Sequence, residues 1–417
     1  MNLADIIETF ISGDWGEESP TEDTPNAVYC VRGADIVPIT NHIFSDIPQR
    51  YVCNRTKETK LLAVGDLVIE KSGGSPTQST GRIVYISEDL VKTKGSVVCS
   101  NFCTAFRVKV GWNPLYVYYY WQNVYNHGAF FNFEGKTSGI KNLQLDNALS
   151  AIEIAYLPLE KQNQIVASLA SIDDKIKVNR QINDNLEAMA KQLYDYWFVQ
   201  FDFPNEDGKP YKSSGGAMVW NEKLKREIPQ GWSNCKLKDF INLFDSKRVP
   251  LSSKDRGERH GIYPYYGATG IMDYVNDYIF DGDYILLAED GSTSDGKGFP
   301  IVQYIWGKNW VNNHAHIILP KNEQYTMFTY QMLRSIPAKQ IETGSIQKKI
   351  SQENLCGYKI ALPNSDLMEK YENIVSPLWE KRKCCFEEIN ALTKQRDELL
   401  PLLMNGQASV NYHLSAC

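Results

Sequence analysis

Apolar side chains recur at alternating spacings of four and three residues in two long stretches of the chain. The first stretch, 159–198, contains no proline and no glycine. Its apolar positions are Ile165, Leu169, Ile172, Ile176, Leu186, Leu193 and Trp197. This period of 3.5 residues is typical of a coiled-coil seam. A helix of that length would extend for roughly 60 Å, which is too long for the interior of a compact domain. We therefore expect it to pack against a helical partner.

The second stretch, 366–404, repeats this pattern near the end of the chain. Its seam positions are Leu367, Tyr371, Ile374, Leu378, Cys385, Leu392, Leu399 and Leu402. Pro377 lies inside the pattern, so we expect a kink or a late helix start there. Asn179 and Asn183 fall on the first seam, where a buried Asn fixes the register of a coiled coil. We predict an antiparallel pair of helices; the alternative is two amphipathic helices in separate cores.

An internal repeat accompanies the two helices. Short matches occur in the same order in both halves: 32–35 with 266–269, 65–69 with 282–286, 100–102 with 312–314, 115–124 with 326–336 and 137–140 with 343–346. Each half then reaches Leu-Pro and a long helix. The offset between matching glycines falls steadily along the chain, as loop-length differences produce and chance matches do not. The chain is therefore predicted to be duplicated.

The expected architecture is α/β (α+β), with two similar mixed α/β domains and two long helices that form an antiparallel coiled coil with a pseudo-two-fold internal repeat. The predicted divisions are a first globular domain (1–157), a central helix (158–200), a linker rich in Gly, Ser and Pro (201–232), a second globular domain (233–362), a distal helix (363–406) and a tail (407–417). Two readers at a fixed separation suit duplex DNA with two half-sites.

Composition changes this picture little. The net charge of −6 argues mildly against a nucleic-acid binder, but residues 50–110 contain ten basic and five acidic residues, and binding depends on the local surface. A solvated mixed surface is the equal alternative. The nine Cys are scattered without a CxxC pair, and the N-terminus lacks a basic leader, so we expect free thiols and a cytoplasmic protein.

No convincing set of catalytic residues is visible. The stretch 291–298 approaches the GxxxxGK[ST] phosphate loop but ends in Gly298 instead of Ser or Thr, so an ATP site is not expected. His314 and His316 could share a strand face, yet a third metal ligand is not evident. We interpret both histidines as packed, hydrogen-bonded side chains and predict neither a catalytic site nor a metal site in this chain.

Basic and hydroxyl residues gather in loops of both halves, where they suit contacts to phosphates and guanine. In the second half they occupy residues 246–260, which lead into a Tyr-rich run. In the first half they occupy 50–60 and 71–77. For any single residue, an ordinary solvated loop is the alternative.

Both long helices carry distinctive motifs. The first carries Pro158-Leu-Glu-Lys-Gln162, Ile172-Asp-Asp-Lys-Ile176, Asn179-Arg-Gln-Ile-Asn183 and Trp197-Phe-Val-Gln-Phe-Asp202. The second carries Arg396-Asp-Glu-Leu-Leu-Pro-Leu-Leu-Met-Asn-Gly406, and Ile228-Pro-Gln-Gly-Trp232 precedes the second globular domain. The helical motifs resemble those of the specificity subunits of Type I restriction–modification systems, and 228–232 resembles the usual entry into their second target-recognition domain.

The resemblance implies a non-catalytic DNA-recognition subunit. Each globular domain would read one half of a bipartite double-stranded DNA target, and the coiled coil would set the spacing and dock two DNA-adenine methyltransferase subunits. ATP-dependent restriction endonuclease subunits would join that complex. S-adenosylmethionine, ATP and Mg would be cofactors of those partners, and none is expected in this chain. Adenine methylation requires a flipped base, so the domains would hold distorted DNA.

The candidate DNA contacts form one set in each half. The first half contributes Arg32, Arg55, Lys57, Lys71, Ser75, Thr77 and Arg82, and the second contributes Arg248, Lys254, Arg256, Tyr265, Tyr266, Thr269 and Lys297. Two other functions remain open: a specificity subunit for a partner that fuses methylation with cleavage, and a coiled-coil scaffold that bridges proteins without touching DNA. An enzyme that uses His314 and His316 is a third alternative.

Overall fold

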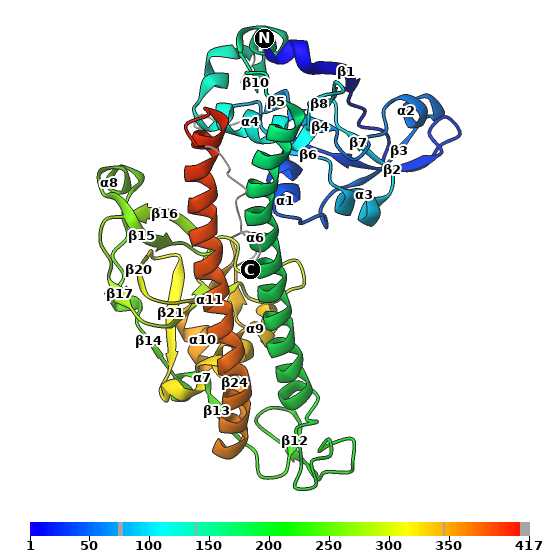
Figure 1. Ribbon diagram of the computed structural model, residues 1–417. Helices are drawn as coiled ribbons and strands as arrows, with labels where there is room; N and C mark the ends of the chain where they lie inside the picture. The colour runs from blue at the N-terminus through cyan, green and yellow to red at the C-terminus, as the bar shows by residue number, and fades with distance from the viewer. Residues whose placement is uncertain (74–77, 138–139, 345–346, 409–417) are drawn as a thin grey trace, which may run out of the picture. The chain divides into compact units, whose positions relative to one another are not determined.

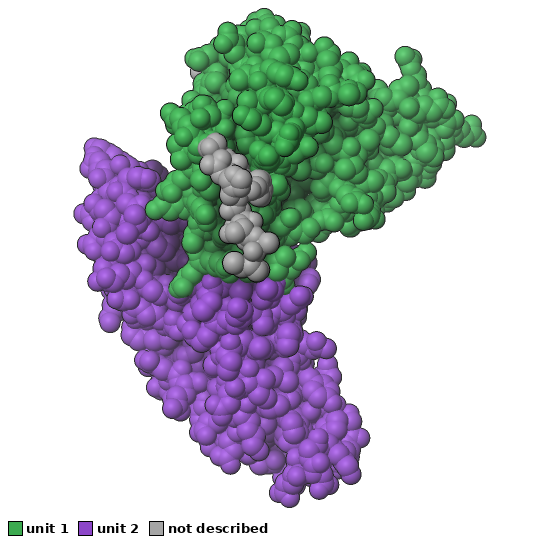
Figure 2. Space-filling model, viewed as in Figure 1, with its two compact units in different colours: residues 1–181, 386–417 green, residues 182–385 purple. Residues whose placement is uncertain are grey.

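The computed structural model describes residues 1–73, 78–137, 140–344 and 347–408. The chain divides into two compact units, coloured separately in Figure 2. Unit 1 comprises residues 1–181 with 386–417, and unit 2 comprises 182–385. Each long helix is thus shared between the units. Of the described helices, none is both long enough and apolar enough to cross a membrane.

Unit 1 is a mixed α/β domain with a four-stranded sheet in the order β1-β8-β4-β6 and a three-stranded sheet in the order β3-β2-β7. Its strands are β1 (Ile7–Ser12), β2 (Asn26–Val31), β3 (Gln49–Val52), β4 (Leu67–Glu70), β5 (Ser72–Gly73), β6 (Ile83–Tyr85), β7 (Val97–Cys99), β8 (Cys103–Val108), β9 (Glu134–Thr137) and β10 (Ile140–Leu143). Its helices are η1 (Leu3–Ile6), η2 (Gly33–Asp35), α1 (Ile36–Thr40), α2 (Asn54–Thr59), α3 (Glu88–Lys94), α4 (Pro114–Asn126), η3 (Ala129–Phe133) and α5 (Leu145–Ala151).

Unit 2 contains a second mixed α/β domain, with four-stranded sheets in the orders β14-β21-β18-β19 and β16-β15-β20-β17. Its strands are β11 (Met218–Asn221), β12 (Arg226–Pro229), β13 (Ser233–Lys236), β14 (Ile241–Leu243), β15 (His260–Tyr266), β16 (Ile271–Val275), β17 (Phe280–Asp281), β18 (Tyr284–Ala288), β19 (Val302–Ile305), β20 (Lys308–Val311), β21 (Ala315–Pro320), β22 (Glu342–Thr343), β23 (Lys349–Ile350) and β24 (Lys359–Leu362). Its helices are α7 (Leu237–Phe240), η5 (Asp245–Lys247), α8 (Ser253–Glu258), η6 (Glu323–Tyr325), α9 (Thr326–Ser335), η7 (Ala338–Gln340) and α10 (Gln352–Gly357).

The sheet orders confirm the predicted internal repeat. The sheets β1-β8-β4-β6 and β14-β21-β18-β19 correspond: in each, the first strand pairs with its last strand in sequence, which then pairs with a buried central strand. Each unit also holds a parallel pair, β2 with β7 and β15 with β20. The aromatic-rich helices α4 and α9 follow β8 and β21, the last strands in sequence of these two sheets. One supersecondary plan is therefore used twice.

The two predicted long helices are present as α6 (Leu159–Tyr194) and α11 (Ser365–Met404), and Figure 1 shows both as unbroken ribbons. A short π-helical turn, η4 (Asp195–Val199), ends the first. The second begins at Ser365 and continues through Pro377, so the late start considered for Pro377 is wrong. Asn364 accepts a hydrogen bond from the Leu367 amide (2.9 Å) and caps that helix.

Within unit 1 the two helices run antiparallel. Asp173 accepts a hydrogen bond from Arg396 (3.0 Å), and six residues later Asn179 donates to Glu388 (2.9 Å). The seam there buries Ile165 and Leu169 together with Leu400, Leu403 and Met404. Unit 2 has the same arrangement, since Glu187 pairs with Arg382 and the Ala190 carbonyl accepts from Tyr371 (3.2 Å).

The predicted seam of α11 is only partly right. Ile374 and Leu402 are 47% and 40% exposed, whereas Val375, Trp379 and Ile389 are buried. The buried face therefore drifts from a strict heptad, because in each unit the helix packs on a globular domain as well as on α6. Asn179 has a partner, but no described residue hydrogen bonds to the buried amide of Asn183. The prediction that a buried Asn fixes the register of the two helices thus applies to Asn179.

Residues 201–232 were predicted to form a linker from their Gly, Ser and Pro content. They instead form an ordered segment with a β-hairpin, β11 paired with β12. The Phe203 ring stacks on Tyr211 (4.6 Å between centroids) and on Trp232 (5.7 Å). Asp202 accepts two hydrogen bonds from Ser213. The aromatic residues outweigh the turn-forming ones here, because their stacking supplies a small core.

In each unit, a carboxylate on α6 ties the globular domain to both long helices. In unit 1, Asp173 accepts from the Tyr119 hydroxyl of α4 (2.6 Å) and from Arg396 of α11. In unit 2, Glu187 pairs with Arg334 of α9 (2.8 Å) and with Arg382 of α11. Each contact joins three elements, so the helices are integral parts of the two folds.

Because of Glu372 in α11, we expect the stability of the folded protein to depend on pH. Burial raises its pKa to about 7, even though its carboxylate accepts the Phe328 amide (2.7 Å) at the start of α9. The folded state therefore binds this proton more tightly than the unfolded state, and the stability gained by protonation is lost as pH rises through 7. Between pH 5 and pH 8, we expect urea unfolding to show Glu372→Gln gaining about 2–3 kcal/mol relative to the wild type. A difference that stays constant across that range would show that Glu372 does not titrate there.

Candidate nucleic-acid interface

The repeated loops meet at the ends of the parallel strand pairs. In unit 1 the Ser100 amide donates to the Val31 carbonyl (2.9 Å), just where β2 and β7 end. In unit 2 the Asn312 amide donates to the Tyr266 carbonyl (3.0 Å) at the ends of β15 and β20. Parallel strands place their carboxyl ends at one edge, so in each unit two of the matched sequence segments lie side by side.

These equivalent hydrogen bonds adjust the sequence alignment by one residue. Val31 opposes Cys99 and Tyr266 opposes Val311, so Val31 corresponds to Tyr266 and Arg32 to Gly267. The glycine-to-glycine match of 33 with 267 is therefore off by one. An irregularity of the β15–β16 register at Tyr265 and Tyr266 accounts for the shift.

Arg32 is held in place by a carboxylate. Its Nε and Nη2 donate to the two carboxylate oxygens of Asp35 (2.9 and 2.8 Å), and its side chain remains 37% exposed. Beside it lies a hollow of about 550 Å³ whose walls include Trp15 and Phe102. Phe102 is 59% exposed. This edge of unit 1 therefore offers a cation, an aromatic ring and a cavity, which together suit contact with nucleic acid.

Arg82 lies behind that edge instead of on it. Its guanidinium makes a bidentate pair with Glu70 (2.8 and 2.6 Å), and the side chains are 16% and 4% exposed. A Cβ on Gly33 would lie 2.4 Å from the same carboxylate. Glycine is needed there because the backbone passes directly over the ion pair. The placement of Arg82 favours support of the loops over contact with DNA.

Arg248 occupies a comparable position in unit 2. Its Nη1 donates to Glu289 (2.8 Å) and to the Ala315 carbonyl (2.8 Å), and its Nε donates to the Asp245 carbonyl (3.0 Å). The side chain is 13% exposed. Arg248 therefore fastens η5 to the ends of β18 and β21, and little of it faces solvent.

His316 completes this ion cluster and was predicted to be a packed, hydrogen-bonded side chain, which is confirmed. Its Nδ1 lies 2.6 Å from Asp245 Oδ2, and its Nε2 lies 2.8 Å from the Ile350 carbonyl. Burial raises the pKa of Asp245, but hydrogen bonds from His316, Ile317 and Gln352 outweigh it and the net shift is downward. Asp245, Glu289 and His316 converge as metal ligands would, yet Arg248 and Gln352 donate to the two carboxylates and both His316 ring nitrogens face protein acceptors, so the cluster fits an ion-pair network better than a metal site.

The other histidine is separate from this cluster. His314 is 47% exposed and its Nδ1 lies 2.6 Å from Asp290. The glycine-rich loop nearby also differs from a phosphate loop, because Asp295 accepts hydrogen bonds from the Lys297 and Phe299 amides (2.8 and 2.9 Å). Amides that would cradle phosphate are therefore already occupied.

Arg256 of α8 packs against Tyr265, one of the two candidate tyrosines, and the other, Tyr266, is half-buried. The Arg256 Nε donates to Asp273 (3.0 Å), and its guanidinium lies 5.3 Å from the centroid of the Tyr265 ring. Tyr265 is 1% exposed and accepts the Leu251 amide (3.0 Å). Burial raises the pKa of the half-buried Tyr266 to about 12. These three residues support the surface loops more than they are exposed on the surface.

The remaining candidates lie at the surface or outside the described residues. Arg55, Lys57, Lys254, Thr269 and Lys297 are exposed, and Lys71 is half-buried. Lys57 donates to Asn26 (3.1 Å). Ser75 and Thr77 lie outside the described residues, so their placement is not tested.

The β15–β16 hairpin adds exposed side chains that sequence reasoning did not select. Ile262, Met272 and Tyr274 are 78%, 55% and 46% exposed. In the sequence they look like ordinary strand residues, and no alternation separates the side chains of 271–275 into a buried and an open face. Exposed apolar side chains of this kind indicate a contact surface. In unit 1, Phe102 is likewise an exposed apolar side chain.

Lys254 provides a direct test of this surface. It is exposed on α8, and no ion pair engages it among the described residues. We expect Lys254→Ala to weaken DNA binding about equally for all sequences and to lower the salt slope of log K by about 1, because it removes one phosphate contact. Fluorescence anisotropy at several salt concentrations measures both quantities. An unchanged slope would remove Lys254 from the interface.

Comparison with known proteins adds evidence of kinship. The sequence model of the family described as "Type I restriction modification DNA specificity domain" matches residues 2–188 and 229–378. The specificity subunit of the type I restriction enzyme MjaIX of Methanocaldococcus jannaschii is 25% identical over 285 residues, which cover 63% of this chain and 62% of that protein. A putative type I restriction enzyme specificity subunit of Haemophilus influenzae, S.HindORF215P, is 32% identical over 157 residues, or 38% and 39% of the two chains. The matched regions span less than two thirds of either relative.

A solved structure shares the fold over nearly the whole chain. The S subunit of a Type-I restriction-modification system from M. genitalium has a TM-score of 0.53 and 15% sequence identity, and the match covers 97% of this chain and 95% of that one. At this identity the likeness concerns the fold alone.

Proposed function

Because this chain belongs to the family of type I restriction–modification DNA specificity proteins, we propose that it selects the DNA sequence on which a methyltransferase and endonuclease complex acts. Each globular domain reads one half of a bipartite site, and the chain itself catalyses no reaction. The duplicated fold is the observation that carries this proposal. Two copies of one reader, each with loops at the end of a parallel strand pair, suit two half-sites.

The long helices act as the spacer between the half-sites in this proposal. Both α6 and α11 continue as helices across the division between the two units. In each unit they are fastened to the domain by a shared carboxylate, Asp173 or Glu187. A rod anchored in this way transmits a fixed length, which a flexible linker does not.

The residues proposed to touch DNA now fall into two groups. Arg32, Arg55, Lys57, Lys71, Lys254, Thr269 and Lys297 are exposed or half-exposed and contact phosphates and base edges. Arg82, Arg248 and Arg256 hold the contacting loops in shape through the carboxylates and carbonyls that surround them, and the buried Tyr265 and half-buried Tyr266 support the same loops. Ser75 and Thr77 remain in the first group on sequence grounds.

Two DNA-adenine methyltransferase subunits dock on the paired helices, and ATP-dependent endonuclease subunits join them. S-adenosylmethionine, ATP and Mg belong to those partners. Co-expression of the tagged chain with a DNA-adenine methyltransferase subunit of the same host tests this assignment. We expect the two to co-purify and to methylate adenine in DNA only together. A methyltransferase that neither co-purifies nor changes its activity when the chain is present would refute the docking role.

A further inference from the structure

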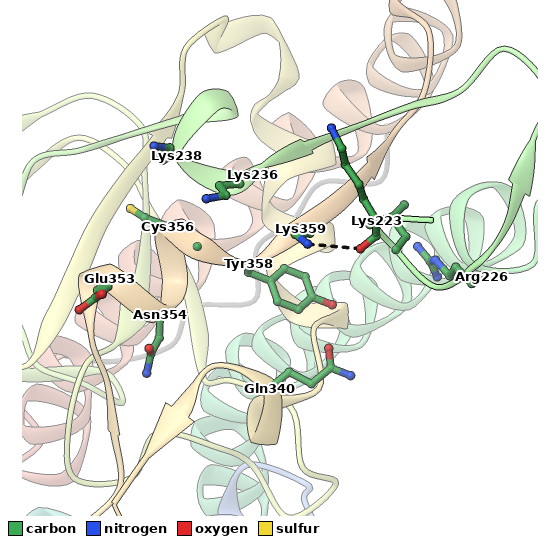
Figure 3. A pocket seen from close by; sticks show the side chains of 12 residues that line it. Lys223, Arg226, Lys236, Lys238, Gln340, Glu353, Asn354, Cys356, Tyr358 and Lys359 are labelled. Carbon is green, nitrogen blue, oxygen red and sulfur yellow. Dashed lines mark hydrogen bonds between the residues drawn. The ribbon is translucent and has the colours of Figure 1, made fainter. Parts of the chain in front are cut away.

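A basic pocket opens on unit 2 at a distance in sequence from the loops discussed above. Five cationic side chains line it, with one carboxylate, that of Glu353, and the half-buried ring of Tyr358. The cations are Lys223, Arg226, Lys236, Lys238 and Lys359. The pocket has a volume of about 850 Å³. In Figure 3, Lys236 and Lys238 lie on one side of Tyr358, and Lys223 and Arg226 lie on the other.

Of the described residues that line this pocket, five are cationic and one, Glu353, is anionic, so most of its positive charge is uncompensated. Neither the four lysines nor Arg226 forms an ion pair among the described residues. The Lys359 Nζ makes one long hydrogen bond, 3.5 Å, to the Lys223 carbonyl. By contrast, carboxylates neutralise Arg82, Arg248 and Arg256. Five such cations around one hollow repel one another unless an anionic ligand is present.

The internal repeat shows that this charge is particular to the second unit. The Leu237 amide donates to the Tyr358 carbonyl (2.8 Å), as the Leu3 amide donates to the Ile152 carbonyl (2.9 Å). The adjacent cross-strand pair is Lys236 with Lys359 in unit 2 and Asn2 with Glu153 in unit 1. Lys238 likewise corresponds to Ala4. Three lysines thus stand where the first unit has an amide, a methyl group and a carboxylate.

The pocket also uses residues of the hairpin that precedes the second domain. Lys223 follows β11 and Arg226 begins β12, and both belong to the ordered hairpin before the second domain. A reader of half-sites needs equivalent surfaces in both units, whereas the described part of unit 1 carries Asn2, Ala4 and Glu153 at the positions of three of these lysines. Its role is therefore distinct from the reading shared by both domains.

We propose that this pocket binds the phosphate backbone of duplex DNA independently of sequence, beyond the bases that unit 2 reads. Lysine supplies a mobile point charge without a fixed geometry, which suits phosphates, and four of the five cations are lysines. The Tyr358 hydroxyl adds a hydrogen-bond donor of the kind that contacts phosphate. An acidic segment of a partner protein is the competing ligand. The proposal rests on the DNA-binding role above, but the two are separable by experiment.

The test transfers the residues of the first unit into the second. The variant K236N/K238A/K359E places in unit 2 the residues that the same backbone carries in unit 1. The control variant K209N/K370A/K381E makes the same substitutions at exposed lysines of unit 2 outside the pocket. Each full-length chain is titrated with a mixed-sequence 40-bp duplex between 50 and 200 mM NaCl. We expect the pocket variant to lower the slope of log K against log salt by about 2–3 and to weaken binding at least tenfold, while the control keeps the wild-type slope.

A second readout uses the native thiol of Cys356, which lines the pocket. We expect the duplex to slow its alkylation at least threefold in the wild type, with the exposed Cys384 as the internal reference. Equal slopes for pocket and control variants, no binding of the duplex by the wild type, or protection of Cys356 by poly-glutamate but not by DNA would each overturn the proposal. If the chain read no sequence at all, target and scrambled duplexes would bind alike, yet the pocket effect would persist on both.

Discussion

A seven-residue insertion made in both long helices is expected to move the preferred DNA spacer by about three base pairs. Duplicating residues 180–186 in α6 and 381–387 in α11 retains the seam, because seven residues are two coiled-coil turns. The rod becomes longer by about 10 Å at 1.5 Å per residue, and duplex DNA rises 3.4 Å per base pair. Binding to the original target should fall at least 100-fold, since one half-site is then missed and each lost base contact costs about 1–3 kcal/mol.

The insertion also changes how the half-sites lie around the duplex. Three base pairs rotate a half-site by roughly a third of a helical turn of 10–10.5 base pairs, so the new optimum should bind less tightly than the wild type binds its own target. Anisotropy titrations with a series of spacers measure the shift, and an insertion in α6 alone is the control that should unfold the seam. Unchanged preference for the original spacer would show that the helices do not set it.

Arg248→Ala is expected to destabilise unit 2 by about 3–5 kcal/mol, the largest effect of any single substitution considered. Its guanidinium neutralises Glu289 and braces the Asp245 turn, and these side chains are 14% and 4% exposed. Removing it leaves buried carboxylates without their cation, which costs more than the pair itself contributes. Urea unfolding monitored by tryptophan fluorescence should show the loss as a lower midpoint.

Lys247→Ala provides the matched control one residue away. Lys247 is exposed and lies 5.2 Å from the centroid of the Phe244 ring, so its removal should change stability by less than about 0.5 kcal/mol. If instead Arg248→Ala kept the wild-type midpoint and weakened only DNA binding, then Arg248 would be a DNA contact. Its ion pairs would then contribute nothing to the free energy of unfolding.

Much of the architecture follows from periodicity alone. The seam residues of 159–198 repeat over five heptads, so no strand can satisfy them, and the duplication is visible because glycines and turn residues recur in order. The equivalent hydrogen bonds that the Ser100 and Asn312 backbone amides donate show why those short matches persist. They mark the points where a parallel pair ends and the backbone of one strand must bond to the loop after the other.

The partners of the charged residues could not be predicted in the same way. Arg82 and Arg248 look like loop cations in the sequence, but Glu70 and Glu289, which neutralise them, are 12 and 41 residues away. Only the folded sheets bring these pairs together. The ordered hairpin of 201–232 was missed for a related reason, because the stacking of Phe203, Tyr211 and Trp232 depends on tertiary contacts that composition does not reveal.

The basic pocket of unit 2 is the clearest example of a feature that the sequence alone does not predict. Three of its lysines lie within residues 223–238, and the fourth, Lys359, follows more than a hundred residues later; no stretch of the sequence is strongly basic there. The comparison with unit 1 gives the pocket its meaning, because the same backbone carries Asn2, Ala4 and Glu153 at the corresponding positions. Duplication thus provides an internal reference for recognising what one copy has gained.

Methylome sequencing of host cells with and without this gene shows whether the chain is a duplicated DNA reader. One adenine-methylated motif is expected to disappear on deletion and to return on complementation, and this motif should have two defined segments separated by a gap of fixed length. A methylome that is unchanged by the deletion, or a lost motif that is contiguous, would contradict a duplicated reader held at a set distance.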